Sequence, residues 1–188
     1  MAIETETRIS NEAYERLALS DGDRKWELWD GVLREKPGMS AAHNEVAFEA
    51  GHMLRTQLDR KAYRVRVDSA KARRPEATYF IPDVMVVPVG FVTPLIDRRG
   101  LEVYDQPLPL VIEVWSPSTG DYDIAEKLVV YQQRGDEEIW YLHPYERTLT
   151  VWRRQPDGSY EESHYREGIV RPIALPGVEI DLAVLFDM

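Results

Sequence analysis

Hydrophobic and polar positions repeat along this chain in two periods, one typical of helices and one typical of strands. Apolar side chains at helical spacing predict two main helices, over residues 40–60 and 121–134, and Ser10 is a suitable N-cap for a shorter helix that reaches about Ser20. Apolar and β-branched runs predict strands at 63–69, 78–87, 110–115 and 139–142. The expected central order is therefore helix, three strands, helix, strand.

Two β-hairpins are expected outside this core, one toward each end of the chain. Asp30-Gly31 separates two extended runs within residues 26–33, which is a strong signal for a two-residue turn. Near the C-terminus, Pro156-Asp157-Gly158 separates the runs 148–153 and 160–166. Both hairpins are expected to attach to the central elements.

The segment between the third and fourth predicted elements of the core looks irregular. Residues 89–107 hold Pro94, Gly100 and Pro107 and are expected to form a surface loop beside the core. Gly135 is expected to end the second main helix. Taken together, the elements predict an α+β fold, α/β-like in its core, with a single domain over residues 1–188.

Acidic residues interrupt two of the apolar strands. Glu113 lies inside the run 110–115 and shares a strand face with Val111 and Trp115, and Asp83 opens another apolar run directly after Pro82. A buried ionised carboxylate is strongly disfavoured unless it is paired or bound to a metal; otherwise the group becomes protonated. Simpler explanations exist for each acid alone, since Asp83 could cap a turn and Glu113 could form a buried salt bridge.

A histidine lies on the inner face of the first main helix. His43 shares that face with Ala47, Ala50 and Leu54, so it is expected to point at the sheet, whereas Glu45 points to solvent. A histidine in such a place is more often a satisfied core residue than a catalyst.

A lysine lies beside the apolar stripe of the second main helix. Ile124, Leu128 and Tyr131 form the stripe, and Lys127 lies at its edge. The simpler explanation is a snorkelling lysine, with its stem on the core and its amine in water. Because this helix follows the Glu113 strand through a short turn, Lys127 is expected near Glu113. Two acids on neighbouring strands and an inward lysine form the smallest set of side chains that can support metal-assisted hydrolysis of a phosphodiester.

Composition narrows the class of protein. With 44% hydrophobic and 30% charged residues in 188, the chain is expected to be globular rather than disordered. The absence of cysteine excludes disulfides and thiolate metal sites and fits a cytoplasmic protein. Residues 1–8 are polar and acidic, so no signal peptide is expected, and no apolar stretch is long enough to span a membrane.

Charge is unevenly distributed along the chain. The net charge of −10 argues against nonspecific wrapping of nucleic acid. Residues 55–74, however, carry eight basic and two acidic side chains, a local balance of +6. This basic strip could hold a phosphate backbone, or it could simply be a solvated helix end and hairpin.

The ordered set of these motifs resembles the Uma family of putative restriction endonucleases, which is placed in the PD-(D/E)XK nuclease superfamily. The resemblance covers about residues 8–155 and rests on motifs in a specific order: residues 26–31, His43, 82–84, 111–119, Lys127, Tyr131, Gly135 and 138–140. It implies a restriction-endonuclease-like core, in which helices flank a mixed central β-sheet, with added N- and C-terminal hairpins.

The resemblance also implies roles for individual residues. Asp83 and Glu113 would be metal ligands, with Val114 in the same metal-binding set. The usual superfamily lysine stands two residues after the second acid, where this chain has Trp115. Lys127 matches a lysine that has moved to the following helix. Glu27 and His43 match the family pattern at the edge of the same pocket and complete the expected catalytic set, in which they would bind metal, position water or only hold the acids.

The expected activity is metal-dependent cleavage of nucleic acid, DNA rather than RNA on family grounds. Oxygen ligands without cysteine suit Mg²⁺ or Mn²⁺. One alternative is a catalytically inactive module on the same fold that binds nucleic acid or a protein. Another is a structural protein whose acids are salt-bridged to Arg73, Arg74 or Lys127. Aromatic residues in the C-terminal strands are expected to serve core or dimer packing, so a homodimer is plausible.

Overall fold

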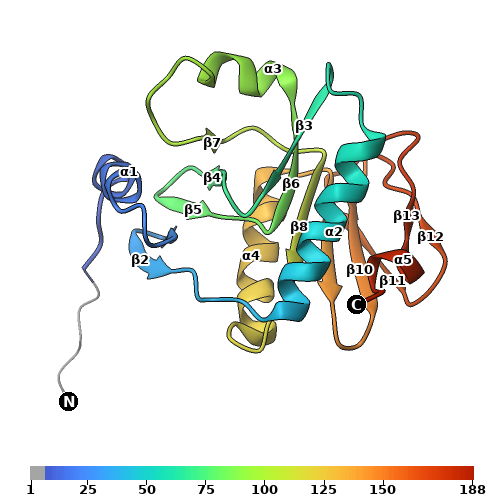
Figure 1. Cartoon of the computed structure of the whole chain (residues 1–188). Coiled ribbons are helices and arrows are strands. Elements are labelled where there is room, and N and C mark those ends of the chain that lie inside the picture. Colours follow the sequence, from blue (N-terminus) through green and yellow to red (C-terminus); the bar gives the residue numbers. More distant parts are fainter. Residues whose placement is uncertain (1–6) are drawn as a thin grey trace.

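The computed structural model describes residues 7–188, with residues 121–123 described by their backbone alone. Most of residues 1–8, where no signal peptide is expected, therefore lies outside the described part. A six-stranded sheet forms the centre of the molecule (Figure 1). In spatial order it consists of β11 (Tyr160–Tyr165), β10 (Thr148–Arg154), β9 (Glu138–His143), β8 (Leu110–Val114), β6 (Val84–Pro88) and β3 (Tyr63–Val67).

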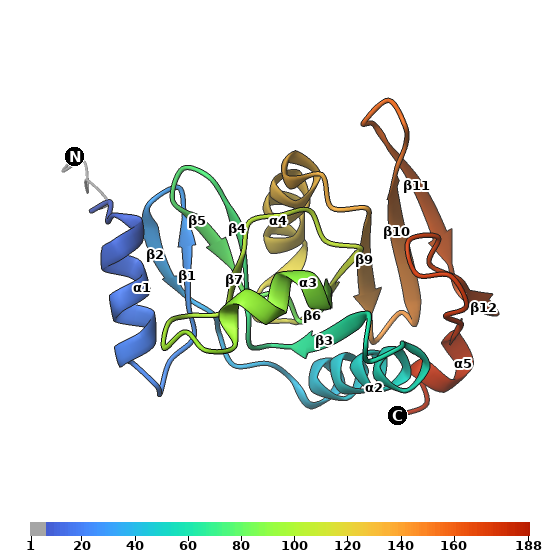
Figure 2. The same cartoon turned by 90° about the horizontal axis from the view of Figure 1, so that it is seen from above.

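The central sheet is mixed and is covered by a helix on each face. β8 and β9 run parallel, whereas the other neighbouring strands are antiparallel. Helix α2 (Ala41–Gln57) lies on one face and α4 (Gly120–Arg134) on the other, as the view from above shows (Figure 2). The expected α+β fold with a restriction-endonuclease-like core is confirmed.

Alternate side chains of the strands fill the two apolar layers. In β6, Val84 and Val86 pack under α2, while Met85 and Val87 pack on the α4 side. In β8 the same alternation directs Glu113 toward α4. The period-two pattern of these strands therefore decides which acid side chain faces which helix.

A second, five-stranded sheet stands beside the first. Its order is β2 (Val32–Glu35), β1 (Trp26–Trp29), β5 (Thr78–Phe80), β4 (Lys71–Arg74) and β7 (Val103–Tyr104). The predicted hairpin at Asp30-Gly31 is present as β1 and β2. Helix α1 (Asn11–Ser20) begins after its expected N-cap, Ser10.

One predicted strand proved to be two. The run at 78–87 was expected to be continuous, but it breaks between Phe80 and Val84, so that β5 belongs to the second sheet and β6 to the central sheet. Pro82 lies in the break, and proline cannot donate a hydrogen bond to a sheet ladder. The break places Asp83 at the junction of the two sheets.

The expectation of a plain surface loop at residues 89–107 was also wrong. This segment contains α3 (Val89–Val92), the 3₁₀ turn η1 (Thr93–Leu95) and β7, which pairs with β4 in parallel. Strand β4 escaped prediction because three of its four residues are basic. The chain ends in β12 (Ile169–Val170), β13 (Ile180–Asp181) and α5 (Leu182–Leu185) beside α2.

The structure also confirms the C-terminal hairpin and the helix ends that the sequence predicts. The C-terminal hairpin of β10 and β11 is present and extends the central sheet. Helix α2 is capped by the Ser40 hydroxyl, and α4 ends at Gly135, which has the left-handed φ of 78° that favours glycine. The expectation of a single domain over residues 1–188 stays a prediction.

A buried ion pair ties the end of α4 to both sheets. Arg134 donates from Nε to Asp136 over 2.9 Å, and its guanidinium also bonds the carbonyl oxygens of Arg73, Tyr104 and Gln106. Asp136, which is fully buried, accepts a further bond of 2.7 Å from the Leu108 N–H. Removing either partner would leave a buried charge without compensation.

Replacing Asp136 with alanine should therefore destabilise the fold by about 3–5 kcal/mol. The neighbouring Glu137 is exposed, so Glu137→Ala should change stability by no more than about 0.5 kcal/mol. Chemical denaturation of the two variants and the parent measures both values. Equal stabilities of the two variants would show that the Arg134–Asp136 pair does not hold the sheets together.

Candidate active site

Asp83 is nearly fully buried where the two sheets meet. Its Oδ2 accepts a hydrogen bond of 2.7 Å from the backbone N–H of Val114, and its Oδ1 accepts one of 2.8 Å from Nζ of Lys36. Val84 pairs with Ile112 in the antiparallel ladder, and one further step in this register puts Asp83 opposite Glu113. The two acids singled out by the strand pattern are thus neighbours.

Glu113 lies on β8 and points at α4, where two side chains hold its carboxylate. The hydroxyl of Tyr131 donates to Oε1 over 2.5 Å, and Nζ of Lys127 lies 3.5 Å from Oε2. Both Glu113 and Tyr131 are buried. A buried salt bridge, the simpler explanation for Glu113, therefore does exist, and its partner is the predicted lysine.

Lys127 is buried, so the snorkelling interpretation was wrong. Its side chain is 2% exposed, and Nζ lies 3.1 Å from Oε1 of Glu27. The ammonium also lies 5.6 Å from the ring centre of Phe80, within cation–π range. The inner face of α4 is rotated from the expected stripe: it buries Lys127, Val130, Tyr131 and Arg134, while Ile124 and Leu128 are half-buried.

Glu27 comes from the second sheet and reaches the same cluster. It lies on β1 and is buried, with Oε1 accepting a 2.8 Å bond from the Ile81 N–H and Oε2 one of 3.2 Å from the Trp29 indole. Both carboxylate oxygens are thus held by the protein, and Oε1 also faces Lys127. The site is therefore built across the junction between the two sheets.

His43 lies on the buried face of α2, as expected. Its Nε2 is 3.0 Å from Oδ2 of Asp83, without the alignment of a hydrogen bond, so this buried nitrogen has no hydrogen-bond partner. The other ring nitrogen, Nδ1, lies 3.2 Å from Oδ1 of Asn44.

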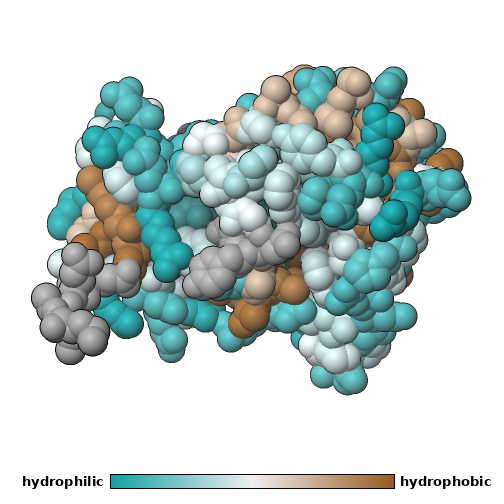
Figure 3. Space-filling view, turned by 90° about the horizontal axis from the view of Figure 1, so that it is seen from below, coloured by the Kyte–Doolittle hydropathy of each residue, from teal (hydrophilic) through white to brown (hydrophobic). Residues whose placement is uncertain are grey.

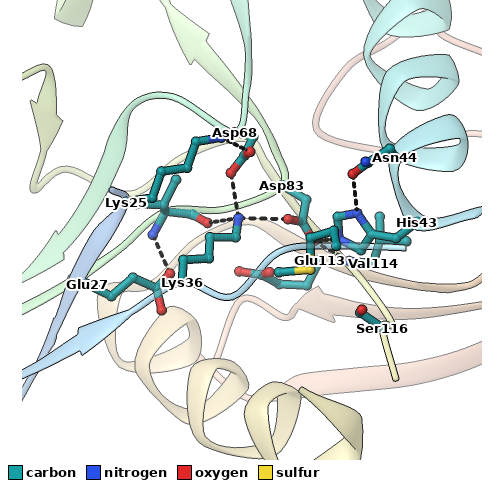
Figure 4. A network of polar contacts seen from close by, with 12 residues as sticks. Lys25, Glu27, Lys36, His43, Asn44, Asp68, Asp83, Glu113, Val114 and Ser116 are labelled. Atoms are coloured by element: carbon teal, nitrogen blue, oxygen red, sulfur yellow. Dashed lines mark hydrogen bonds and ion pairs between the residues drawn. The ribbon is translucent and has the colours of Figure 1, made fainter. Parts of the chain in front are cut away.

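Lys36 is a member of the cluster that sequence reasoning missed. It follows β2, yet its side chain is only 3% exposed. Its amine lies 2.8 Å from each of three oxygens, which belong to Asp68, Asp83 and the Ile81 carbonyl (Figure 4). Asp68 also pairs with Lys25 at the surface. The burial of Lys36 depends on partners distant in sequence, so no local pattern could have shown it.

The two central acids differ in their electrostatic state. Burial pushes the pKa of Asp83 upward, but the ammonium of Lys36 and the nearby His43 outweigh burial and hold that pKa well below its ordinary value. For Glu113, burial dominates over the attraction of Lys127 and raises the pKa to about 8. Burial and the Glu113 charge also raise the pKa of the Tyr131 hydroxyl. Such divergence between adjacent acids is common at functional sites.

A small hollow lies beside this cluster. Glu113, Val114 and Lys127 line it together with Thr119 and Tyr141, and the room for the centre of a water-sized sphere is about 10 Å³. That volume suits about one water or one ion. Asp83 does not line the hollow; it contacts the main chain of Val114 instead. The described side chains include no group of three histidine or acidic residues already arranged to hold a metal.

Three of the eight basic residues in the strip at residues 55–74 are paired with acids of the same chain. Arg66 pairs with Glu102 at 2.7 Å, Arg73 with Asp105 at 2.6 Å, and Arg74 with Asp30. Lys71 is buried, and burial lowers the pKa of its amine. These four side chains therefore add little free positive charge to the surface, which leaves Arg55, Arg60, Lys61 and Arg64 as the cationic part of the strip. On the side seen from below, hydrophilic residues cover most of the surface (Figure 3).

Comparison with known proteins relates this arrangement to nucleases. The crystal structure of a putative nuclease belonging to DUF820 from Anabaena variabilis ATCC 29413 superposes with a TM-score of 0.76, over 92% of this chain and 96% of that one. At 18% sequence identity, this superposition shows that the two proteins share a fold and no more. No curated protein matches the chain.

A family model agrees with the structural comparison. The model described as Uma2, putative restriction endonuclease, matches residues 11–184. This range includes every residue of the cluster: Glu27, Lys36, His43, Asp83, Glu113 and Lys127. The resemblance seen in the sequence motifs is thereby confirmed, and the chain belongs to the Uma2 family of putative restriction endonucleases.

Proposed function

We propose that this protein is a metal-dependent endonuclease that hydrolyses phosphodiester bonds of DNA. One observation carries the proposal: the buried residues Asp83 and Glu113 stand opposite each other at the end of the β6–β8 register, and the Lys127 amine lies 3.5 Å from the Glu113 carboxylate. Membership of the Uma2 family supports the same reaction class. We assign Asp83, Glu113 and Lys127 to catalysis, with Glu27 and His43 at the edge of the site.

The donor set suits a hard divalent cation. Carboxylate oxygens of Asp83 and Glu113 and the main-chain oxygen of Val114 would hold Mg²⁺ or Mn²⁺. The unpartnered Nε2 of His43 beside Asp83 supports this fit, because a buried polar atom without a partner is costly unless a ligand satisfies it. The small hollow that Glu113 and Val114 line has room for one such ion, and Asp83, which does not line it, bonds the main chain of Val114. When bound, the ion would polarise a phosphate oxygen and lower the pKa of a coordinated water.

The side chains around the ion would have separate tasks. Lys127 would hold the attacking water and stabilise negative charge that develops on the phosphate oxygens. Glu27, 3.1 Å from the Lys127 amine, would orient that amine and favour its charged form. Tyr131 would fix the Glu113 carboxylate through its 2.5 Å hydrogen bond. His43 is close enough to Asp83 to assist proton transfer.

Location and oligomeric state are further parts of the proposal. The cysteine-free sequence supports a cytoplasmic protein. Within residues 7–188, no helix has both the length and the apolar character needed to cross a membrane. A homodimer could pair through β11, the aromatic edge strand of the central sheet, although Tyr160 and Tyr165 of this strand already bond Asp136 and Arg153 of the same chain. Light scattering in solution measures the number of chains.

Neutral isosteres of the two acids should abolish the activity. Asp83→Asn and Glu113→Gln should each lower Mn²⁺-dependent cleavage by at least about 100-fold, because each loses a charged metal ligand worth several kcal/mol. The substrates are supercoiled plasmid, single-stranded DNA and RNA, each with Mg²⁺ or Mn²⁺. Glu45→Gln, on the exposed side of α2, is the matched control and should keep full activity.

The same variants distinguish the proposal from its alternatives. Calorimetric titration with Mn²⁺ should show binding to the parent that both acid variants lose, with circular dichroism confirming that they fold. Binding without cleavage of any substrate would favour a non-catalytic binding module. No binding at all would leave the acids as structural salt-bridge partners.

The raised pKa of Glu113 predicts how the metal-free protein responds to pH. Between the ordinary pKa of 4.5 and about 8, folded Glu113 keeps a proton that the unfolded chain has released. Its contribution should therefore make the fold less stable as pH rises through this window, by at most about 1.4 kcal/mol per pH unit, and level off above it. Thermal melts in EDTA from pH 5 to 9 measure the trend. The slope should be smaller in Glu113→Gln; identical slopes would contradict the assignment.

A further inference from the structure

The ammonium of Lys36 occupies a cage of oxygens inside the site. The carboxylates of Asp68 and Asp83 and the Ile81 carbonyl each lie 2.8 Å from Nζ, and the side chain is almost completely buried. An ammonium group has three N–H donors, so these three acceptors use all of them. Lys36 is consequently held in place and has no donor left for a substrate.

Asp83 presents a different environment to each of its oxygens. Oδ1 faces the Lys36 ammonium, while Oδ2 accepts the Val114 N–H and lies near His43. In two-metal nucleases, two ions about 3.5–4 Å apart share the site and clamp the attacking and leaving oxygens. In this chain, Oδ1 of Asp83 already contacts the Lys36 ammonium, a fixed positive charge that belongs to the protein.

The charges of the ion-paired groups also favour a single ion. The carboxylates of Glu27, Asp68, Asp83 and Glu113, when ionised, carry four negative charges, and the three ammonium groups paired with them belong to Lys25, Lys36 and Lys127. One divalent ion more than offsets the remaining negative charge. A second divalent ion would leave an excess of three positive charges in a largely buried cluster, which is strongly unfavourable.

We propose that the Lys36 ammonium takes the place of a second metal ion, so that the site binds one divalent ion per chain. This inference rests on the proposed metal-dependent function and specifies its metal stoichiometry. Lys36 is a positioning residue in this scheme: it acts through Asp83 and not on the substrate. The second lysine, Lys127, faces the hollow next to Glu113 and has the separate task assigned above.

Counting bound Mn²⁺ tests the inference without any use of activity. Isothermal titration calorimetry and the electron paramagnetic resonance signal of free Mn²⁺ should give one ion per chain for the parent. Lys36→Ala opens the cage formed by Asp68, Asp83 and the Ile81 carbonyl and should raise the count to two. Lys25→Ala removes an exposed ammonium that also pairs with Asp68 and should leave the count at one.

The possible results separate this inference from the proposed function. Two ions in the parent, or one ion in a folded Lys36→Ala protein, would overturn the role of Lys36 while leaving the metal site intact. No Mn²⁺ bound by the parent or the variant would overturn the metal site itself and this inference with it. If Lys36→Ala does not fold, Lys36→Gln replaces it: the shorter, neutral side chain should likewise admit a second ion, and a count of one would contradict the inference.

Discussion

The buried carboxylate of Asp83 is the constraint on which the rest of this structure depends. It sits where the chain leaves one sheet and enters another, and it receives a lysine ammonium from one side and a backbone N–H of the central sheet from the other. A buried ionised carboxylate is tolerated only when neighbouring groups pair with it and donate hydrogen bonds to it. The break at Pro82, the burial of Lys36 and the position of His43 in the first turn of α2 all place groups around this one carboxylate.

The cluster around Asp83 combines a stable arrangement with a reactive one. On one side, Lys36 and Asp83 form a saturated ion pair in which no N–H donor is unused. On the other side, Glu113 is close to neutrality at physiological pH, faces a lysine at 3.5 Å and borders a hollow the size of one ion. The Lys36–Asp83 pair is rigid, whereas Glu113 beside Lys127 can change its protonation state. This combination suits hydrolysis, because metal ligands must stay in place while negative charge develops on the substrate.

Sequence reasoning found much of the fold and part of the site, for identifiable reasons. Glu113 and Asp83 stood out because an acid inside an apolar run has few physical explanations, and both proved buried and adjacent. Lys36 and Asp68 did not stand out, because a lysine before a proline and an acid after a short strand look like ordinary surface residues. The burial of Lys36 arises from contacts with residues more than thirty positions away, and such contacts leave no local pattern.

Both sheets contribute residues to the cluster, and this limits how the fold can vary. Glu27 and Lys36 come from the N-terminal hairpin and the segment that follows it, whereas Glu113 and Lys127 come from the central sheet and its helix. A shortened relative that kept only the six-stranded sheet would retain the two acids on its strands. It would, however, lose the oxygen that faces Lys127 from β1 and the cation that neutralises Asp83. The small sheet is thus as much a part of the chemistry as the large one.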